Sequence, residues 1–168
     1  MSAQIIDGKA IAAEVRDKVR LAIEQRIKNK QRAPGLAVIL VGLDPASQVY
    51  VRKKREACDE AGLISKSFDL DESTDQQKLL DLIEDLNNDA SIDGILVQLP
   101  LPPHIDDTLV LEAIHPDKDV DGFHPVNVGK MVLGEQCFLP CTPHGILEML
   151  TRSGIDTSGK EVVILGRS

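Results

Sequence analysis

The sequence has no excess of positive charge. Its 168 residues include 19 Lys and Arg against 27 Asp and Glu, which gives a formal net charge of -8. Proteins that follow a phosphate backbone depend on clustered Lys and Arg side chains. The composition therefore predicts a protein that does not bind nucleic acid.

Cysteine is scarce as well. The chain has three, Cys58, Cys137 and Cys141. An odd number in a long chain, without closely paired ligand spacing, indicates neither a disulfide framework nor a zinc site. We expect reduced thiols and no bound metal.

Long apolar runs, internal repeats and low-complexity tracts are also missing. The opening MSAQIIDGKA has no basic region followed by an apolar stretch, and no run approaches the roughly 20 residues that span a bilayer. These absences predict a soluble, cytoplasmic protein that does not enter a membrane.

What the chain has is 42% hydrophobic residues in regular patterns, enough to bury a core. Apolar residues that recur every three or four positions predict a helix over 11–27. Short, unbroken apolar runs are typical of buried strands. By these criteria the sequence predicts further helices at 47–61 and 74–88, and strands at 36–41, 66–70 and 94–99.

Strands and helices therefore alternate along this part of the chain. A parallel connection needs a crossover long enough for a helix, so alternation favours a parallel sheet with helices on both faces. For residues 1–140 we predict an α/β three-layer sandwich with a mostly parallel sheet.

The composition changes to Pro, His and Asp after Pro100. Thr142 and Pro143 then predict an N-cap and a first-turn proline for a helix that continues to about Leu150. A final apolar strand is expected over 161–168, and the helix that normally follows a strand and glycine turn is missing. The sequence thus predicts a second domain that begins near residue 141 and is truncated.

Lys54 has an unusual position on its helix. Projected at 100° per residue, it falls in the middle of an apolar arc that contains Ala57, Tyr50, Ala61, Cys58 and Val51. The lysine either extends to the surface or points into a cleft, where it could transfer protons. Tyr50 lies one turn earlier, so the pair could present an aromatic platform beside an amine, which suits a flat heterocyclic substrate.

Gln98 lies at the end of the predicted strand over 94–99. Ligands of open α/β sheets bind outside the carboxyl ends of the strands. Gln98 could therefore orient Lys54 through a hydrogen bond, or it could bond the last backbone groups of its own strand. Position alone leaves both interpretations open.

The sequence over 117–122 reads D-x-D-x-D-G, which matches the start of a calcium loop. A calcium loop needs a bidentate Glu at its twelfth position, where this chain has Val128. Pro116 and Pro125 do not suit the two helices that flank such a loop. Calcium binding is therefore not expected.

The aspartates of this turn have two possible uses. Asp121 could accept hydrogen bonds from the amino and ring N–H groups of a pterin-like ring. Turn and cap chemistry is at least as good an explanation for Asp117 and Asp119. His115 and His124 have no third ligand at metal spacing, and no role is assigned to them.

Four stretches together resemble one known family. They are GLDPAS at 42–47, Y-V-x-x-K-x-x-A-C at 50–58, DGILVQLPLP at 93–102 and HPDKDVDGF at 115–123. In this order and at this spacing they strongly resemble the bifunctional methylenetetrahydrofolate dehydrogenase/methenyltetrahydrofolate cyclohydrolase family. The resemblance covers essentially the whole chain.

The resemblance implies a folate site with tetrahydrofolate derivatives as substrates. Its lining residues would be Tyr50, Lys54, Gln98, Leu99, Pro100 and Asp121. It implies catalytic roles for Lys54 as the proton-transfer group, Gln98 as its holder and Asp121 as the pterin anchor. It further implies oxidation of the methylene compound with NADP, and hydrolysis of the methenyl product to 10-formyltetrahydrofolate.

The resemblance also implies a cofactor site. Gly166, Arg167 and Ser168 look like the start of the family's NADP loop, whose backbone approaches the phosphates. Residues 141–168 would then be a linker helix and the first strand of a truncated Rossmann-type NADP-binding domain. We expect a homodimer for the full-length enzyme. The alternative for the 168-residue fragment is a folate-binding module without dehydrogenase turnover.

Overall fold

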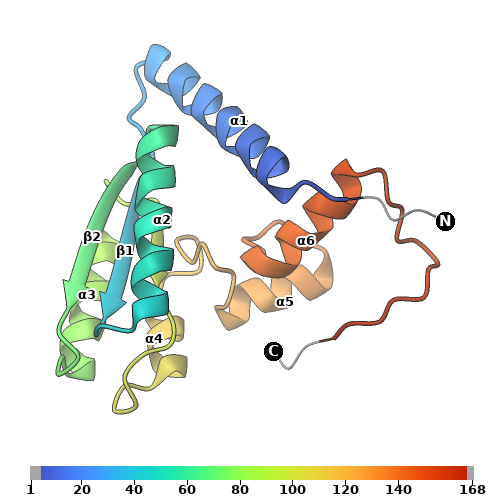
Figure 1. The fold of residues 1–168 in the computed structure, drawn as a ribbon. Coiled ribbons are helices and arrows are strands. Elements are labelled where there is room, and N and C mark those ends of the chain that lie inside the picture. Colours follow the sequence, from blue (N-terminus) through green and yellow to red (C-terminus); the bar gives the residue numbers. More distant parts are fainter. Residues whose placement is uncertain (1–4, 166–168) are drawn as a thin grey trace.

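The structure is a computed structural model that describes residues 5–165. The elements in chain order are α1 (Gly8–Lys28), β1 (Gly35–Val41), α2 (Pro45–Ala61), β2 (Ile64–Leu70), α3 (Gln76–Asn88), β3 (Gly94–Val97), α4 (Asp107–Ala113), α5 (Pro125–Leu133) and α6 (Cys141–Arg152) (Figure 1). None of these helices is both long and apolar enough to cross a membrane.

The three strands form one sheet in the order β2-β1-β3, and both pairings are parallel. In this register Val38 of β1 lies between Ser67 of β2 and Leu96 of β3. The predicted α/β fold with a parallel sheet is confirmed.

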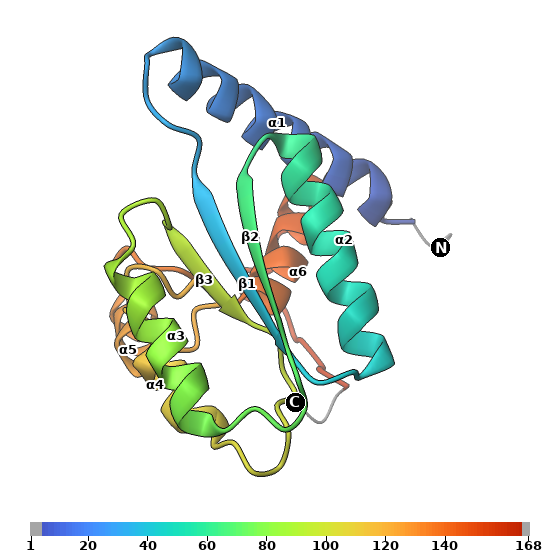
Figure 2. The ribbon, with the colours of Figure 1, turned by 90° about the vertical axis from the view of Figure 1, so that its left-hand side faces the viewer.

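Two cores fix the layers, because successive side chains of a strand point to opposite faces. Ile39 and Ile95 face the core formed with α3 and α4, where Leu79 is fully buried. Val38 faces the other core, which includes Val51 of α2. Figure 2 shows α3 and α4 on one side of the sheet and α2 on the other, so the region has three layers.

Side-chain caps set the starts of the first helices. The Asp44 carboxylate accepts the Ser47 N–H at 3.0 Å, and the Asp75 carboxylate accepts the Lys78 N–H at 2.9 Å. Each bond satisfies a backbone donor that has no partner within its helix. α3 consequently begins at Gln76, two residues later than the predicted start at Thr74.

Two helices in the Pro-, His- and Asp-rich region, α4 and α5, were not predicted. Asp106 caps α4, and α5 begins at Pro125 with His124 as its N-cap. The view that Pro125 does not suit a helix is therefore wrong, because the first helical position needs no N–H donor. The argument against calcium then depends on Val128 and Pro116.

The last helix starts two residues earlier than predicted. α6 begins at Cys141, its N-cap is Pro140 rather than Thr142, and no side chain caps it. The His144 N–H donates to the Pro140 carbonyl at 3.1 Å, which closes the first turn. Pro143 still lies in that first turn, where its missing N–H costs nothing.

The strand expected over 161–168 does not form in the part that the structure describes. Residues 161–165 have no regular structure, and Val162 and Leu165 are 66% and 94% exposed. A strand needs a neighbour for its hydrogen bonds, and within residues 5–165 none lies beside this segment. Residues 166–168 lie outside the described residues.

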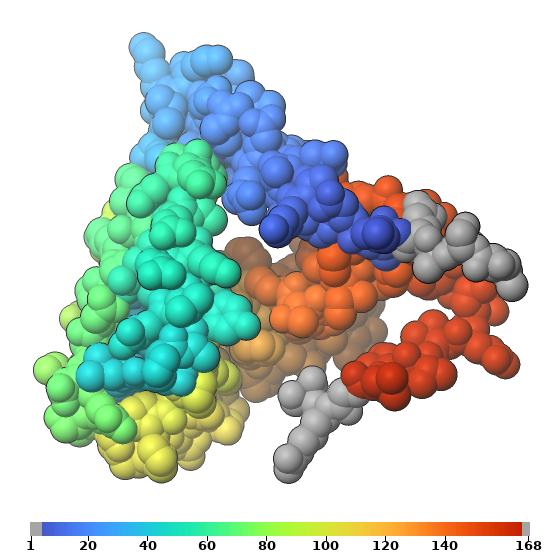
Figure 3. All heavy atoms as spheres, in the orientation of Figure 1, coloured from blue at the N-terminus to red at the C-terminus, as the bar shows by residue number. Residues whose placement is uncertain are grey.

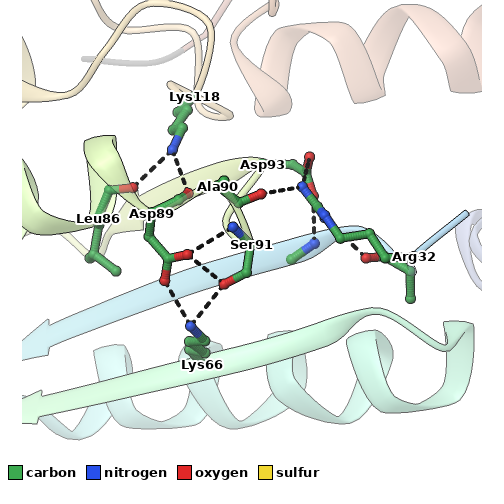
Figure 4. Close-up of polar contacts among 10 residues, drawn as sticks. Arg32, Lys66, Leu86, Asp89, Ala90, Ser91, Asp93 and Lys118 are labelled. Atoms are coloured by element: carbon green, nitrogen blue, oxygen red, sulfur yellow. Dashed lines mark hydrogen bonds and ion pairs between the residues drawn. The ribbon is translucent and has the colours of Figure 1, made fainter.

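A polar network fastens the α3–β3 loop to the amino-terminal ends of the strands (Figure 4). Lys66 of β2 donates to the Asp89 carboxylate at 2.8 Å and to the Ser91 hydroxyl at 3.0 Å. Arg32 binds the Asp93 carboxylate and donates to the Ala90 carbonyl at 2.7 Å. The loop is thus tied to β2 and to the segment before β1.

Asp93 links this network to β1 directly. Its carboxylate accepts the Gly35 N–H at 2.7 Å, and its own N–H donates to the Gly35 carbonyl at 2.8 Å. The Arg32 hydrogen bond holds the pKa of the Asp93 carboxyl below its usual range, although partial burial opposes this.

Asp93→Asn is expected to make the free energy of unfolding less dependent on pH between pH 7 and pH 3. A carboxyl whose pKa is depressed on folding stabilises the protein above its unfolded pKa of about 3.9, and this contribution is lost as pH falls through the folded value. The variant should have a lower urea midpoint at pH 7, and the gap to the parent should narrow toward pH 3. The exposed Asp85 of α3 is the control, since Asp85→Asn should leave the gap near zero throughout. A constant gap from pH 7 to pH 3 would contradict the role of ionised Asp93.

Candidate active site

The predicted site residues begin with a contact between α2 and the end of β3. Lys54 Nζ donates to Gln98 Oε1 at 3.1 Å, across 44 positions of sequence. Gln98 Nε2 donates to the Leu99 carbonyl at 2.7 Å. Both interpretations of Gln98 therefore apply, because it contacts Lys54 and also bonds the backbone that follows its strand.

The packing of α2 fixes where Lys54 points. Val51 and Cys58, one turn before and after it, are both buried, Val51 against the sheet, while Lys54 is half-buried. The lysine thus lies at the margin of the apolar face and reaches toward the carboxyl end of β3. The lysine is therefore only partly exposed, and its amine is engaged by Gln98.

Asp121 lies on the same side of the molecule. Burial raises the pKa of its carboxyl, the Lys54 charge lowers it, and the Asp119 charge raises it again. The site therefore brings together an amine, an amide and a carboxyl from three separate parts of the chain. Such a set can hold and protonate a polar heterocycle.

The turn that carries Asp121 is fixed by hydrogen bonds of Asp119 and Lys118. Asp119 is only 2% exposed, and its carboxylate accepts the His124 N–H at 2.8 Å and the Asn127 side-chain N–H at 2.9 Å. Lys118 Nζ donates to three carbonyls at the end of α3, at 2.7–2.9 Å. Turn and cap chemistry is what Asp119 performs in this structure.

Tyr50 precedes Lys54 by one turn and is 61% exposed. An exposed ring at this place has a free face for a flat ligand. Leu99 is half-buried and Pro100 is exposed, and the bond between them is cis. Figure 3 shows the surface hollowed between α2 and the α5–α6 region, with α1 above.

A cavity of about 580 Å³ lies elsewhere, on another flank of α2. Its lining includes Gln48, Arg52 and Arg55 of the helix, and Asp69 at the end of β2. None of the predicted site residues lines it, whereas Pro100 lines a separate cavity of about 370 Å³ together with Gly42 and Asp44. Within residues 5–165, no three His, Cys, Asp or Glu side chains are grouped as metal ligands.

The sequence did not single out one neighbour of the site. Cys141, expected only to be a reduced thiol, lies close enough to Asp121 and Lys54 for their charges to act on its ionisation. No local spacing signals this, because α6 brings the thiol across from a distant part of the chain. Gly166, Arg167 and Ser168 lie outside the described residues, so their cofactor role stays a prediction.

Comparison with known proteins identifies relatives along the whole chain. The family model for the tetrahydrofolate dehydrogenase/cyclohydrolase catalytic domain matches residues 6–121. The bifunctional protein FolD of Magnetococcus marinus is 58% identical over 166 residues, which cover 99% of this chain and 58% of the relative. The chain thus spans a little under three fifths of that relative's length.

Two solved structures have the same fold. The bifunctional FolD dehydrogenase/cyclohydrolase of Campylobacter jejuni superposes with a TM-score of 0.95 at 49% identity, covering 99% of this chain and 59% of that one. The dehydrogenase-cyclohydrolase of Trypanosoma brucei, solved with NADP cofactor and inhibitor, has a TM-score of 0.94 at 38% identity and covers 100% and 58%. On these matches, the chain belongs to the tetrahydrofolate dehydrogenase/cyclohydrolase family.

Proposed function

We propose that this chain carries the folate site of an enzyme that oxidises 5,10-methylenetetrahydrofolate with NADP and hydrolyses the methenyl product to 10-formyltetrahydrofolate. The observation that supports it best is the contact between Lys54 and Gln98 beside Asp121, at the carboxyl end of the sheet. The bifunctional relatives favour an enzyme over a folate-binding module without turnover.

The two reactions act on one carbon atom. In the oxidation, the carbon that bridges the two folate nitrogens loses a hydride and becomes a methenyl cation. NADP, when bound, accepts that hydride. In the hydrolysis, water adds to the cationic carbon and loses a proton, which leaves a hydroxyl on that carbon. The bond from this carbon to N5 then breaks as N5 gains a proton and the hydroxyl loses its own, so that the carbon stays on N10 as the formyl group.

The side chains of the site have separate tasks in this proposal. Lys54 moves the proton released when water adds, since an amine within reach of the substrate can serve as acid and base. Gln98 holds the lysine through the 3.1 Å bond. Asp121 accepts hydrogen bonds from the pterin ring.

The apolar part of the site positions the rest of the substrate. Tyr50 stacks on the flat portion of the folate, which its exposed ring permits. Leu99 and Pro100 form the wall that follows Gln98. These contacts bind without taking part in proton transfer.

The wider organisation belongs to the same proposal. Residues 1–140 would form the folate-binding catalytic domain. Residues 141–168 would form a linker helix and the start of a Rossmann-type domain, with Gly166, Arg167 and Ser168 at NADP. The Trypanosoma relative solved with NADP supports this cofactor. We further propose that the full-length enzyme is a cytoplasmic homodimer that acts on tetrahydrofolate derivatives and binds neither nucleic acid nor membrane.

Two absorbance assays test the function, on protein that carries this chain within the full length of its relatives. Loss of the methenyl absorbance should exceed the spontaneous rate in proportion to enzyme. Growth of the reduced-nicotinamide band should require methylenetetrahydrofolate, with NADP strongly preferred over NAD. Methenyl hydrolysis at the spontaneous rate would contradict the hydrolase proposal, and a preference for NAD would contradict the cofactor.

A further inference from the structure

Cys141 contacts the loop that carries Asp121. It is the first residue of α6, and its Sγ donates to the Val120 carbonyl at 3.5 Å. Val120 immediately precedes Asp121 in the chain. The thiol therefore holds the backbone on one side of the proposed pterin anchor.

The other side of Asp121 is held by the segment that leads to Cys141. Gly122 has φ +68°, and a Cβ there would lie 2.8 Å from both the Phe138 carbonyl oxygen and the Leu139 carbonyl carbon. The two backbones approach so closely that only glycine fits. Residues on both sides of Asp121 are thus fixed by residues 138–141.

Three charged groups face the thiol. Cys141 as a residue is exposed, but partial burial of its sulfur raises the pKa of the thiol, the neighbouring Asp121 carboxylate raises it further, and Lys54 lowers it. Asp119 adds a smaller increase from beneath the turn. Near neutral pH the sulfur is therefore a protonated thiol, which can donate a hydrogen bond as a thiolate cannot.

We propose that Cys141 is a positioning residue of the folate site, whose thiol fixes the loop at Val120 and the orientation of the Asp121 carboxyl. The inference rests on the proposed function for its purpose, which is to present Asp121 to the pterin ring. The contact between the Cys141 thiol and the loop lies within this chain and needs no ligand, so it can be tested without folate.

The first test measures the coupling between Cys141 and Asp121 with iodoacetamide, which reacts with thiolates. The alkylation rate of each cysteine is followed at pH 7.5 by peptide mass spectrometry. Asp121→Asn should speed alkylation of Cys141 by about three- to tenfold, since loss of the carboxylate charge increases the thiolate fraction. Cys137 in the same sample is the internal control and should keep its rate. An unchanged rate at Cys141 would overturn the proposal.

The second test separates positioning from mere stability. Cys141→Ala should raise the KM for the folate substrate by about threefold to tenfold with little change in kcat, since a weak hydrogen bond is lost. Cys141→Ser keeps a donor and should restore most of the KM. Cys137→Ser is the matched control and should match the parent. Equal KM values in all variants would refute the role of Cys141, whereas loss of folate activity in the parent would refute the proposed function instead.

Discussion

Lys54→Met is expected to reduce methenyltetrahydrofolate hydrolysis by about a hundredfold or more, in line with the usual contribution of a general acid–base group. Methionine keeps most of the side-chain length but cannot carry a proton, so the hydrogen bond to Gln98 is lost as well. Folate binding should stay nearly the same, because the stacking and pterin contacts come from other residues. The decrease in methenyl absorbance measures the rate of hydrolysis, and calorimetry measures the affinity for folate.

Tyr50→Ala is the matched contrast within the same site. It removes the exposed ring one turn away but leaves the lysine in place, so folate affinity should fall while hydrolysis of bound substrate continues. Together the two variants separate chemistry from binding. Hydrolysis at the parent rate in Lys54→Met would remove this lysine from the mechanism.

Gly35→Ala is expected to destabilise the fold by about 3 kcal/mol or more, the upper part of the range for overpacked sites. A Cβ at this position would lie 2.0 Å from the Ser91 carbonyl oxygen, a backbone atom that cannot turn away. The backbone of Gly35 itself is also tied to Asp93 by two hydrogen bonds, so β1 would have to move away from that loop. Urea unfolding measures the loss.

Gly129→Ala provides the control in a helix. A Cβ at Gly129, within α5, would meet nothing within 4 Å. Alanine is the better helix former, so the variant should gain up to about 1 kcal/mol. If Gly35→Ala unfolds at the same urea concentration as Gly129→Ala, the close approach of Ser91 does not exclude a side chain at position 35.

The sheet and the long helices can be predicted from the sequence because their buried residues follow a regular pattern along the chain. β1 is a run of apolar residues covered on both faces, and α2 and α3 place apolar residues at helical spacing. α4 is only 7 residues long, too short for a period to appear. Its start depends on Asp106, whose capping role is clear only once the backbone position is known.

The site divides in the same way. Lys54 could be found from the sequence because a charged residue interrupts an apolar arc, and Gln98 because it follows a buried strand. Cys141 could not be found, since its neighbours come from the turn at 117–122 and from α2, which are not adjacent to it in the chain. Local patterns report which face a residue lies on, but not which distant groups it meets.

The short pairing between Ile95 and Asp119 has a consequence for how copies of the protein behave toward one another. It adds a parallel bridge beside β3, so backbone groups on that outer border are partly occupied. An exposed edge strand can pair with a strand of another molecule and so promote aggregation, and charged side chains on the edge strand commonly prevent this. Within residues 5–165 the uncovered border is that of β2, which includes Lys66 and Asp69. The protein thus covers part of one sheet edge with its own backbone and has charged residues, Lys66 and Asp69, in the strand at the other edge.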